Sequence, residues 1–130
     1  MKVFNLNTQK HASNKKLNMF FENVLGKKEF VLLVHADWCG HCQVMKKDWK
    51  KAKQAQKKNV SYVVEMEHTV YTHFVNHHKD HTFSKVLSSS VSGFPCIVRV
   101  GVFQKGIVDI NEFEGERVKD DFVKFMGGSS

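Results

Sequence analysis

Two cysteines separated by two residues are the part of this chain whose spacing most clearly allows chemistry. Cys39 and Cys42 stand between an apolar run at 30–34 and a Lys-rich stretch at 43–58, which predicts a strand, the cysteine pair and a helix in that order. Two thiols on the first turn of a helix can close a disulfide with little backbone movement. The first thiol meets unpaired N–H groups and the positive end of the helix dipole, which favour the thiolate. Because the thiolate is the nucleophile in disulfide exchange, we expect Cys39 to be reactive.

The residues around the pair indicate which kind of Cys-x-x-Cys site it forms. A Cys-x-x-Cys pair alone also occurs in zinc sites, but Trp38 directly before it is more specific. The stretch 38–42 resembles the active site of the thioredoxin superfamily, and its Gly40-His41 pair resembles the protein disulfide isomerase type, since thioredoxin has Gly-Pro there. We expect His41 to stabilise the reduced form and make the disulfide a better oxidant.

The resemblance implies a role for each residue of the pair. Cys39 attacks a substrate and forms a mixed disulfide, Cys42 resolves it, and Trp38 shields the site and contacts the substrate. In most catalytic members of the family a buried acid lies six residues before the first cysteine and takes the proton of the resolving thiol, but here that position is Leu33. Its stand-in is His35 or a water, unless His35 is an ordinary strand histidine.

Two further departures concern the helix after the pair. Gln43 stands where the family has a lysine, and Lys47 stands where thioredoxins usually carry a kinking proline. We therefore expect a straighter helix.

Pro95, the single proline of the chain, marks a second part of the site. It heads a β-rich run, and in the family a proline in this setting has a cis peptide bond and packs against the active-site disulfide. The residue before it, Phe94, is implied to offer backbone groups to an extended substrate. Cys96 is interpreted as a small buried strand residue, with a third thiol that regulates the pair or binds metal with it as the alternative.

The end of the chain resembles the end of catalytic isomerase domains. Arg117 matches the family arginine that swings toward the resolving cysteine and favours its thiolate, and the alternative is an exposed arginine at a helix start. We expect Val118, Phe122 and Phe125 to line the buried face of the last helix.

The elements that position these residues predict an α/β thioredoxin-like fold, with a central mixed β-sheet flanked by α-helices. The first three strands are expected to pair in parallel. One domain is expected over 1–126, followed by a flexible Gly/Ser tail at 127–130. The expected order is a strand within 2–6, a helix at 15–25, a strand at 30–35, a helix from 40, a strand at 60–66, a helix within 69–92 ending in a Ser-rich loop at 88–90, a hairpin of 99–103 with 107–110 turning at 104–106, and a last helix to 125.

Composition limits the partners. The formal charge is +7, and seven lysines lie within 46–58 beside one acid, Asp48. We interpret this as the solvated face of a helix; binding of nucleic acid or another anionic partner is the alternative, and without interleaved aromatic residues no nucleic acid is expected. Three cysteines are too few for a disulfide scaffold and leave Cys96 unpaired.

A group of four histidines is the one candidate metal site. The members are spaced i, i+4 in two pairs, with Asp80 among them: His73, His77, His78 and His81. No further ligand has matching spacing, so a solvated helix is preferred and no metal is expected. No cofactor is expected either, because electrons pass by thiol exchange.

The predicted function is therefore a thiol–disulfide oxidoreductase of the protein disulfide isomerase type. It would form, reduce or rearrange disulfides in cysteine-containing proteins, and an unidentified redox partner or glutathione would recharge it. The alternatives are a thioredoxin-like intracellular reductase and a redox-poor peptide-binding module, which Leu33 makes conceivable. No membrane span is expected. The absence of a signal peptide or retention motif favours an intracellular location, cytoplasmic or viral, and a removed signal would place the chain in the endoplasmic reticulum lumen.

Overall fold

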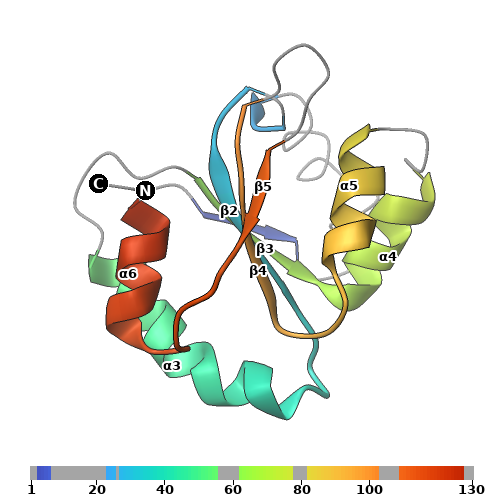
Figure 1. The fold of residues 1–130 in the computed structure, drawn as a ribbon. Coiled ribbons are helices and arrows are strands. Elements are labelled where there is room, and N and C mark those ends of the chain that lie inside the picture. Colours follow the sequence, from blue (N-terminus) through green and yellow to red (C-terminus); the bar gives the residue numbers. More distant parts are fainter. Residues whose placement is uncertain are drawn as a thin grey trace.

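The computed structural model describes residues 3–6, 23–25, 27–55, 62–77, 82–102 and 109–127. Its strands form one mixed sheet in the order β1-β3-β2-β4-β5, with helices against both faces (Figure 1). The strands are β1 (Val3–Leu6), β2 (Phe30–His35), β3 (Tyr62–Glu67), β4 (Cys96–Val100) and β5 (Ile110–Glu112). The helices are α3 (Gly40–Ala55), α4 (His68–His77), α5 (Thr82–Ser90) and α6 (Lys119–Gly127). The predicted α/β class, a mixed sheet flanked by helices, is confirmed.

Strand direction brings distant parts of the chain to one edge of the sheet. β1 and β2 both run parallel to β3, as predicted, whereas β4 runs antiparallel to β2. The ends of β2 and β3 therefore meet the beginning of β4. In this register His35 lies opposite Glu67, and Val34 lies opposite Cys96. The residues that follow β2, follow β3 and precede β4 are thus neighbours at this edge.

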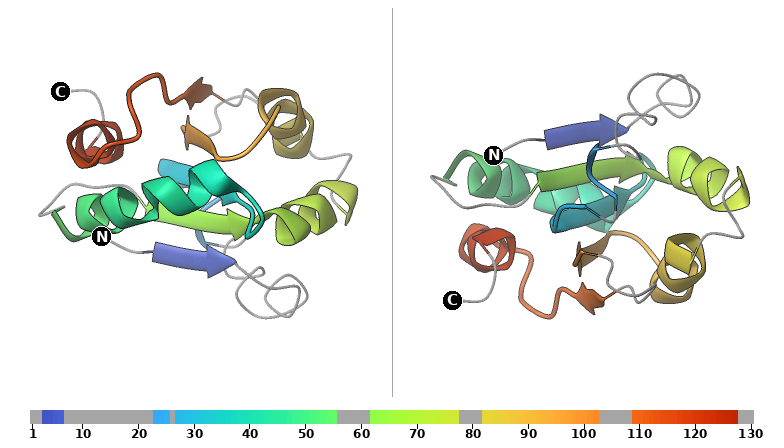
Figure 2. Two further views of the ribbon diagram at one scale, coloured as in Figure 1. Left: turned by 90° about the horizontal axis from the view of Figure 1, so that it is seen from below. Right: turned by 90° about the horizontal axis from the view of Figure 1, so that it is seen from above.

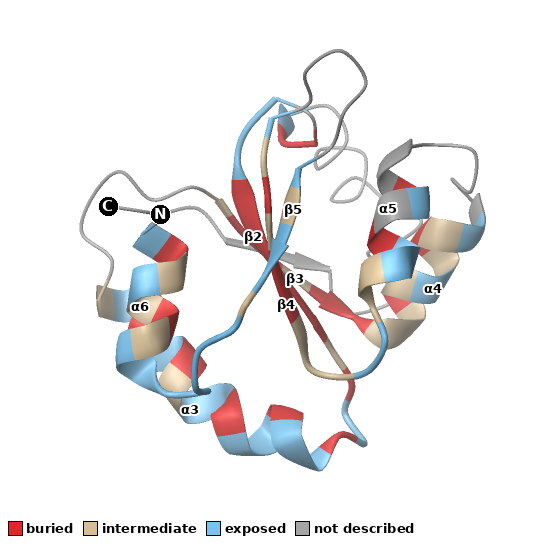
Figure 3. Cartoon of the chain, in the orientation of Figure 1, coloured by how far each residue is buried: buried red, intermediate tan, exposed pale blue. Residues whose placement is uncertain are grey.

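Successive side chains of β2 point alternately into two hydrophobic cores, one on each face of the sheet. Phe30, Leu32 and Val34 pack with residues of α4 and α5, and Val31 and Leu33 pack with residues of α3 and α6. Figures 1 and 2 show these two helix pairs on opposite faces of the sheet. β2 is covered on both sides, so its buried positions follow one another without a break (Figure 3). This is why the run is continuously apolar rather than alternating.

Helices α3 and α6 pack against each other through aromatic rings. Trp49 and Phe122 are buried and make an edge-to-face contact, with ring centroids 5.1 Å apart. α3 continues unbroken through Lys47, where the family proline is missing. The expectation for Val118 is wrong: it precedes α6 and is 42% exposed, and Met126 completes the buried face instead. Phe122 and Met126 are one turn apart, so they face α3 together.

An acid of α3 caps the beginning of α6. The Lys119 amide donates a hydrogen bond to Asp48 Oδ2 at 2.9 Å. Asp121 in the first turn of α6 accepts another from the Glu116 amide at 2.8 Å. The first amides of a helix lack partners within it, so Asp48 satisfies one of them, while Asp121 ties the preceding loop to the helix. Both carboxylates lie at the positive end of the helix dipole, where negative charge is stabilising. The single acid among the lysines of α3 thus has a structural role.

Other differences from the sequence-based prediction lie in the helices and the hairpin. Residues 88–90 belong to α5 rather than to a loop, because buried Leu87 anchors the helix. The Ser88 and Ser89 hydroxyls donate back to the Lys85 carbonyl oxygen, both at 3.1 Å. Residues 69–92 thus form two helices. The second hairpin strand, β5, includes Ile110 of the predicted strand, continues to Glu112 and pairs with β4, whereas residues 107 and 108 lie outside the described residues. Gly127 is the last residue of α6 rather than part of a tail.

Some predicted elements fall outside the part of the chain that the structure describes. These are most of the helix at 15–25, the turn at 104–106, and residues 128–130. Within the described residues, no helix has the length and the apolar character needed to cross a membrane.

Candidate active site

Cys39 and Cys42 lie where β2 passes into α3. The Cys39 amide donates to the Ala36 carbonyl oxygen at 3.1 Å, which closes a turn just before α3 begins at Gly40. The Cys42 amide donates to Cys39 Sγ, also at 3.1 Å. The sulfur therefore takes the place of an N-cap oxygen at the positive end of the helix dipole.

The two thiols have different surroundings. Both are free and largely covered, with 6% of Cys39 and 8% of Cys42 exposed. Burial, helped by a hydrogen bond with Cys39, raises the pKa of the Cys42 thiol to about 11, although the Ala36 backbone and the Arg117 charge act in the opposite direction. Cys42 therefore keeps its proton at physiological pH, whereas the Cys39 sulfur accepts a hydrogen bond from an amide.

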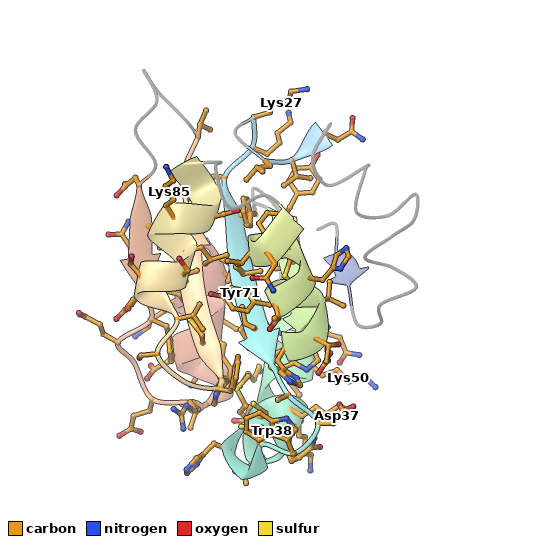
Figure 4. The ribbon with its side chains drawn as sticks, turned by 90° about the vertical axis from the view of Figure 1, so that its right-hand side faces the viewer. Lys27, Asp37, Trp38, Lys50, Tyr71 and Lys85 are labelled. Carbon is orange, nitrogen blue, oxygen red and sulfur yellow. The ribbon has the colours of Figure 1, made fainter. Side chains whose placement is uncertain are left out.

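An aromatic surface covers one side of the pair. Trp38 is 68% exposed, and its ring meets the rings of Phe94 and His68 edge to face, at centroid distances of 5.6 and 5.5 Å. Figure 4 shows Trp38 beside Asp37 at the start of α3, at the end of the molecule that carries the cysteines. Trp38 thus stands out from the surface rather than packing into the core.

The segment before β4 completes the site on the other side. The Phe94–Pro95 peptide bond is cis, as the resemblance implies. Cys39 Sγ lies 3.4 Å from the Phe94 carbonyl oxygen. The backbone just before Pro95 and the first sulfur are therefore side by side. Arg117 is exposed in the loop before α6 and, with Pro95, lines a hollow of about 390 Å³.

A second cavity lies behind Cys42 and beside Leu33. It has a volume of about 300 Å³, and its lining includes His35 and Glu65. Leu33 is buried, and its register partner on β3 is Glu65. The Glu65 carboxylate accepts a hydrogen bond from Trp49 Nε1 at 3.0 Å and pairs with Lys53 Nζ. A carboxylate is therefore present in this region, but it comes from β3 rather than from β2.

Comparison with known proteins agrees with this geometry. The family model named Thioredoxin matches residues 10–127. The chain belongs to the thioredoxin family. Within the family, the protein disulfide isomerase of Drosophila melanogaster is 31% identical over 108 residues, which cover 82% of this chain and 19% of that protein. Protein disulfide-isomerase A6 of Homo sapiens is 29% identical over 107 residues, which cover 80% of this chain and 21% of that protein.

Solved structures show the same fold. The first thioredoxin domain of mouse protein disulfide-isomerase A4 matches with a TM-score of 0.54 at 19% identity, over 94% of this chain and 71% of that chain. The Trx4 domain of ERdj5 matches with a TM-score of 0.56 at 14% identity, over 94% and 91%. The chain spans about a fifth of the length of the curated relatives it matches. It is thus a thioredoxin-family domain that is similar to one part of each of these disulfide isomerases.

The remaining residues of the family motif lie on the first turn of α3. His41 is exposed between the two cysteines. Gly40 begins the helix, and a Cβ added there would meet no atom of the described residues within 4 Å. The Gln43 side chain donates to the Asp37 carbonyl oxygen at 3.3 Å, so it ties the loop before the pair to the helix.

Cys96 and the histidine group, the other candidates from the sequence, are not part of the Cys39–Cys42 pair. Burial, followed by the charge of Glu112, raises the pKa of Cys96 to about 11, so this third thiol stays protonated and weakly nucleophilic. Of the histidine group, His73 lies half-buried on α4, and His78 and His81 fall outside the described residues. Among the residues that the structure describes, no three His, Cys, Asp or Glu side chains form a metal-binding group.

Sequence reasoning missed the residues that β3 contributes to this site. Glu67, the last residue of β3, accepts hydrogen bonds from the Thr69 amide at 2.8 Å and from the Thr69 hydroxyl, and it pairs with His68 Nδ1 at 2.5 Å. Burial alone would raise the pKa of Glu67, but these bonds outweigh it and lower the pKa. Because β2 and β3 are parallel, the residues after each strand meet at one edge, and this signal was available in the sequence.

Proposed function

We propose that this chain is a catalytic domain of the protein disulfide isomerase type. It would form, reduce or rearrange disulfides in protein substrates through Cys39 and Cys42. The observation that carries the proposal is the 3.1 Å hydrogen bond from the Cys42 amide to Cys39 Sγ, at the first turn of α3. A sulfur held in this way is ready to act as a nucleophile.

The first step is the attack of the Cys39 thiolate on a substrate disulfide. A new bond forms between Cys39 and one substrate sulfur, and the other substrate sulfur leaves as a thiolate. The Phe94 backbone, 3.4 Å from Cys39 Sγ, is placed to pair with an extended substrate segment. The exposed Trp38 ring offers an apolar surface beside that segment.

The second step is resolution by Cys42. Its sulfur attacks Cys39 Sγ, the mixed disulfide breaks, and a Cys39–Cys42 disulfide forms while the substrate leaves as a thiolate. The substrate is reduced and the domain is oxidised. Because the pKa of Cys42 is raised to about 11, this step needs a proton acceptor. Running both steps in reverse oxidises a substrate dithiol, and repeated attack and release rearranges disulfides.

His41 favours the isomerase or oxidase direction over a reductase. It lies exposed between the cysteines, where its N–H group stabilises the sulfur of the reduced form. A stabilised reduced form makes the disulfide more oxidising. Glutathione or a redox partner protein would recharge the pair, and the substrates are cysteine-containing proteins. The sequence left more than one compartment open for this chain. Its similarity to disulfide isomerases favours the endoplasmic reticulum lumen.

Trapping tests the proposal. The reduced Cys42→Ser variant is mixed with a peptide that carries one intramolecular disulfide, and the products are separated by mass spectrometry. We expect a lasting adduct on Cys39, because the resolving sulfur is gone. The Cys39→Ser/Cys42→Ser variant should form none, and Cys96→Ser should behave like the wild type.

Other outcomes would contradict this function. Failure of Cys42→Ser to form an adduct, or an adduct on Cys96 instead, would show that Cys39 is not the attacking group. Equal retention of the peptide by the wild type and by Cys39→Ser/Cys42→Ser would point to the binding-module alternative.

A further inference from the structure

Cys42 must lose its proton before it can resolve a mixed disulfide. With a pKa of about 11, only about one molecule in 10,000 carries the thiolate at pH 7. In the mixed disulfide Cys39 is no longer a thiolate, so its hydrogen bond and charge disappear, but the burial of Cys42 remains. A nearby proton acceptor would therefore speed this step.

The cavity behind Cys42 holds one imidazole among its described lining residues, that of His35. His35 is the last residue of β2 and shares a sheet face with Leu33, the face toward α3. The cavity, of about 300 Å³, has room for water between polar groups. Cys42 and His35 line the same cavity, so water in it offers a route for a proton between them.

Two of the three carboxylates that line this cavity, those of Glu65 and Glu67, are already hydrogen-bonded or ion-paired. The Glu65 carboxylate binds Trp49 Nε1 and Lys53 Nζ. Glu67 binds the Thr69 amide and hydroxyl, and these bonds hold it ionised. Glu67, whose pKa these bonds lower, is a poor proton acceptor, and the carboxylates stabilise a positive charge that forms nearby.

The charged groups around His35 come from three elements. Glu65 and Glu67 lie on β3, Asp37 lies in the loop after β2, and Lys46 lies on α3. Burial lowers the pKa of His35 below 6.5, against the effect of the three carboxylates and together with that of Lys46. The imidazole is therefore neutral at pH 7.

We propose that His35 accepts the Cys42 proton during resolution, while Glu65, Glu67 and Asp37 stabilise the imidazolium that forms. This proposal rests on the proposed oxidoreductase function. As the S–H bond of Cys42 breaks, its electron pair forms the bond to Cys39, and the substrate sulfur leaves with the electrons of the broken mixed disulfide. The proton then passes from His35 to solvent or to the departing thiolate, so no other reactant is needed.

The test separates attack from resolution. The reduced wild type and His35→Gln are mixed with oxidised glutathione, and samples are quenched by acid and alkylated over time. Formation of the glutathione adduct on Cys39 measures attack, and its decay measures resolution. A general base contributes about 10²–10⁴-fold, and solvent replaces part of it. We expect His35→Gln to slow resolution between about 10- and 100-fold at pH 7 and to change attack less than about 2-fold.

A pH profile excludes a merely structural role. In the wild type, resolution should slow as pH falls through a value below 6.5, because a protonated imidazole cannot accept a second proton. His35→Gln should lack this inflection, and Glu65→Gln should move it to lower pH, because that carboxylate raises the pKa of His35. His73→Gln, on α4, is the matched control and should behave like the wild type.

Three results would overturn the proposal. One is resolution in His35→Gln within about 2-fold of the wild type. Another is a wild-type profile without the inflection, which NMR titration of the His35 ring would check without any variant. The third is loss of resolution in Glu65→Gln while His35→Gln remains active. If no Cys39 adduct forms in any protein, the proposed function itself fails, and this inference with it.

Discussion

The cap that α3 provides for α6 leads to a quantitative prediction. Asp48 Oδ2 accepts the Lys119 amide at 2.9 Å. Replacing a capping acid by alanine costs about 1 kcal/mol, and losing a charge near a helix N-terminus costs about 0.3–1 kcal/mol more. We expect Asp48→Ala to lower the free energy of unfolding by about 1.5 kcal/mol, and Asp48→Asn, which keeps an acceptor oxygen, by about 0.5 kcal/mol. At about 4 °C per kcal/mol, Tm falls by about 6 °C and about 2 °C.

Urea unfolding followed by circular dichroism and by tryptophan fluorescence measures these changes. Asp120→Asn is the matched control, since it removes the same charge from the exposed first turn of α6. It should cost at most about 0.5 kcal/mol. The reasoning is refuted if Asp48→Ala costs no more than Asp120→Asn, or if Asp48→Asn is as damaging as Asp48→Ala.

Three further predictions concern the core, the surface and the thiols. Phe122→Ala should lower the free energy of unfolding by about 3–5 kcal/mol in urea titrations, because the ring is fully buried against Trp49, and a cost under about 1 kcal/mol would contradict this packing. Trp38→Ala should change stability by less than about 0.5 kcal/mol yet slow exchange with a protein disulfide, and normal exchange rates would count against Trp38 as a contact surface. Between pH 9 and 11 the unfolded chain loses thiol protons that folded Cys42 and Cys96 keep, so the free energy of unfolding should fall as pH rises through this range. A free energy of unfolding that does not change over this range would contradict the raised pKa values of the two thiols.

Local patterns in the sequence predicted the elements that carry the cysteine pair. The apolar run at 30–35 and the Lys-rich stretch after it have the lengths of a buried strand and an amphipathic helix, and β2 and α3 follow them. The family resemblance added the cis bond before Pro95, which no local pattern determines. These parts were predictable because each depends on a few neighbouring residues or on a specific motif.

The features that the sequence did not predict depend on tertiary packing. The serines at 88–90 resemble a loop by composition, but the burial of Leu87 keeps the segment helical. Val118 fits a helical pattern, yet α6 begins after it. The cavity behind Cys42 also depends on strand register, which places Glu65 of β3 beside Leu33 of the neighbouring strand β2.

The most direct test of the central claim is the reduction potential of the Cys39–Cys42 pair in glutathione buffers. We predict a value near about −180 mV, typical of protein disulfide isomerase. A value near about −270 mV would indicate a thioredoxin-like reductase, and the gap of about 90 mV corresponds to about 4 kcal/mol for two electrons. A pair that does not equilibrate with glutathione at all would contradict the catalytic role.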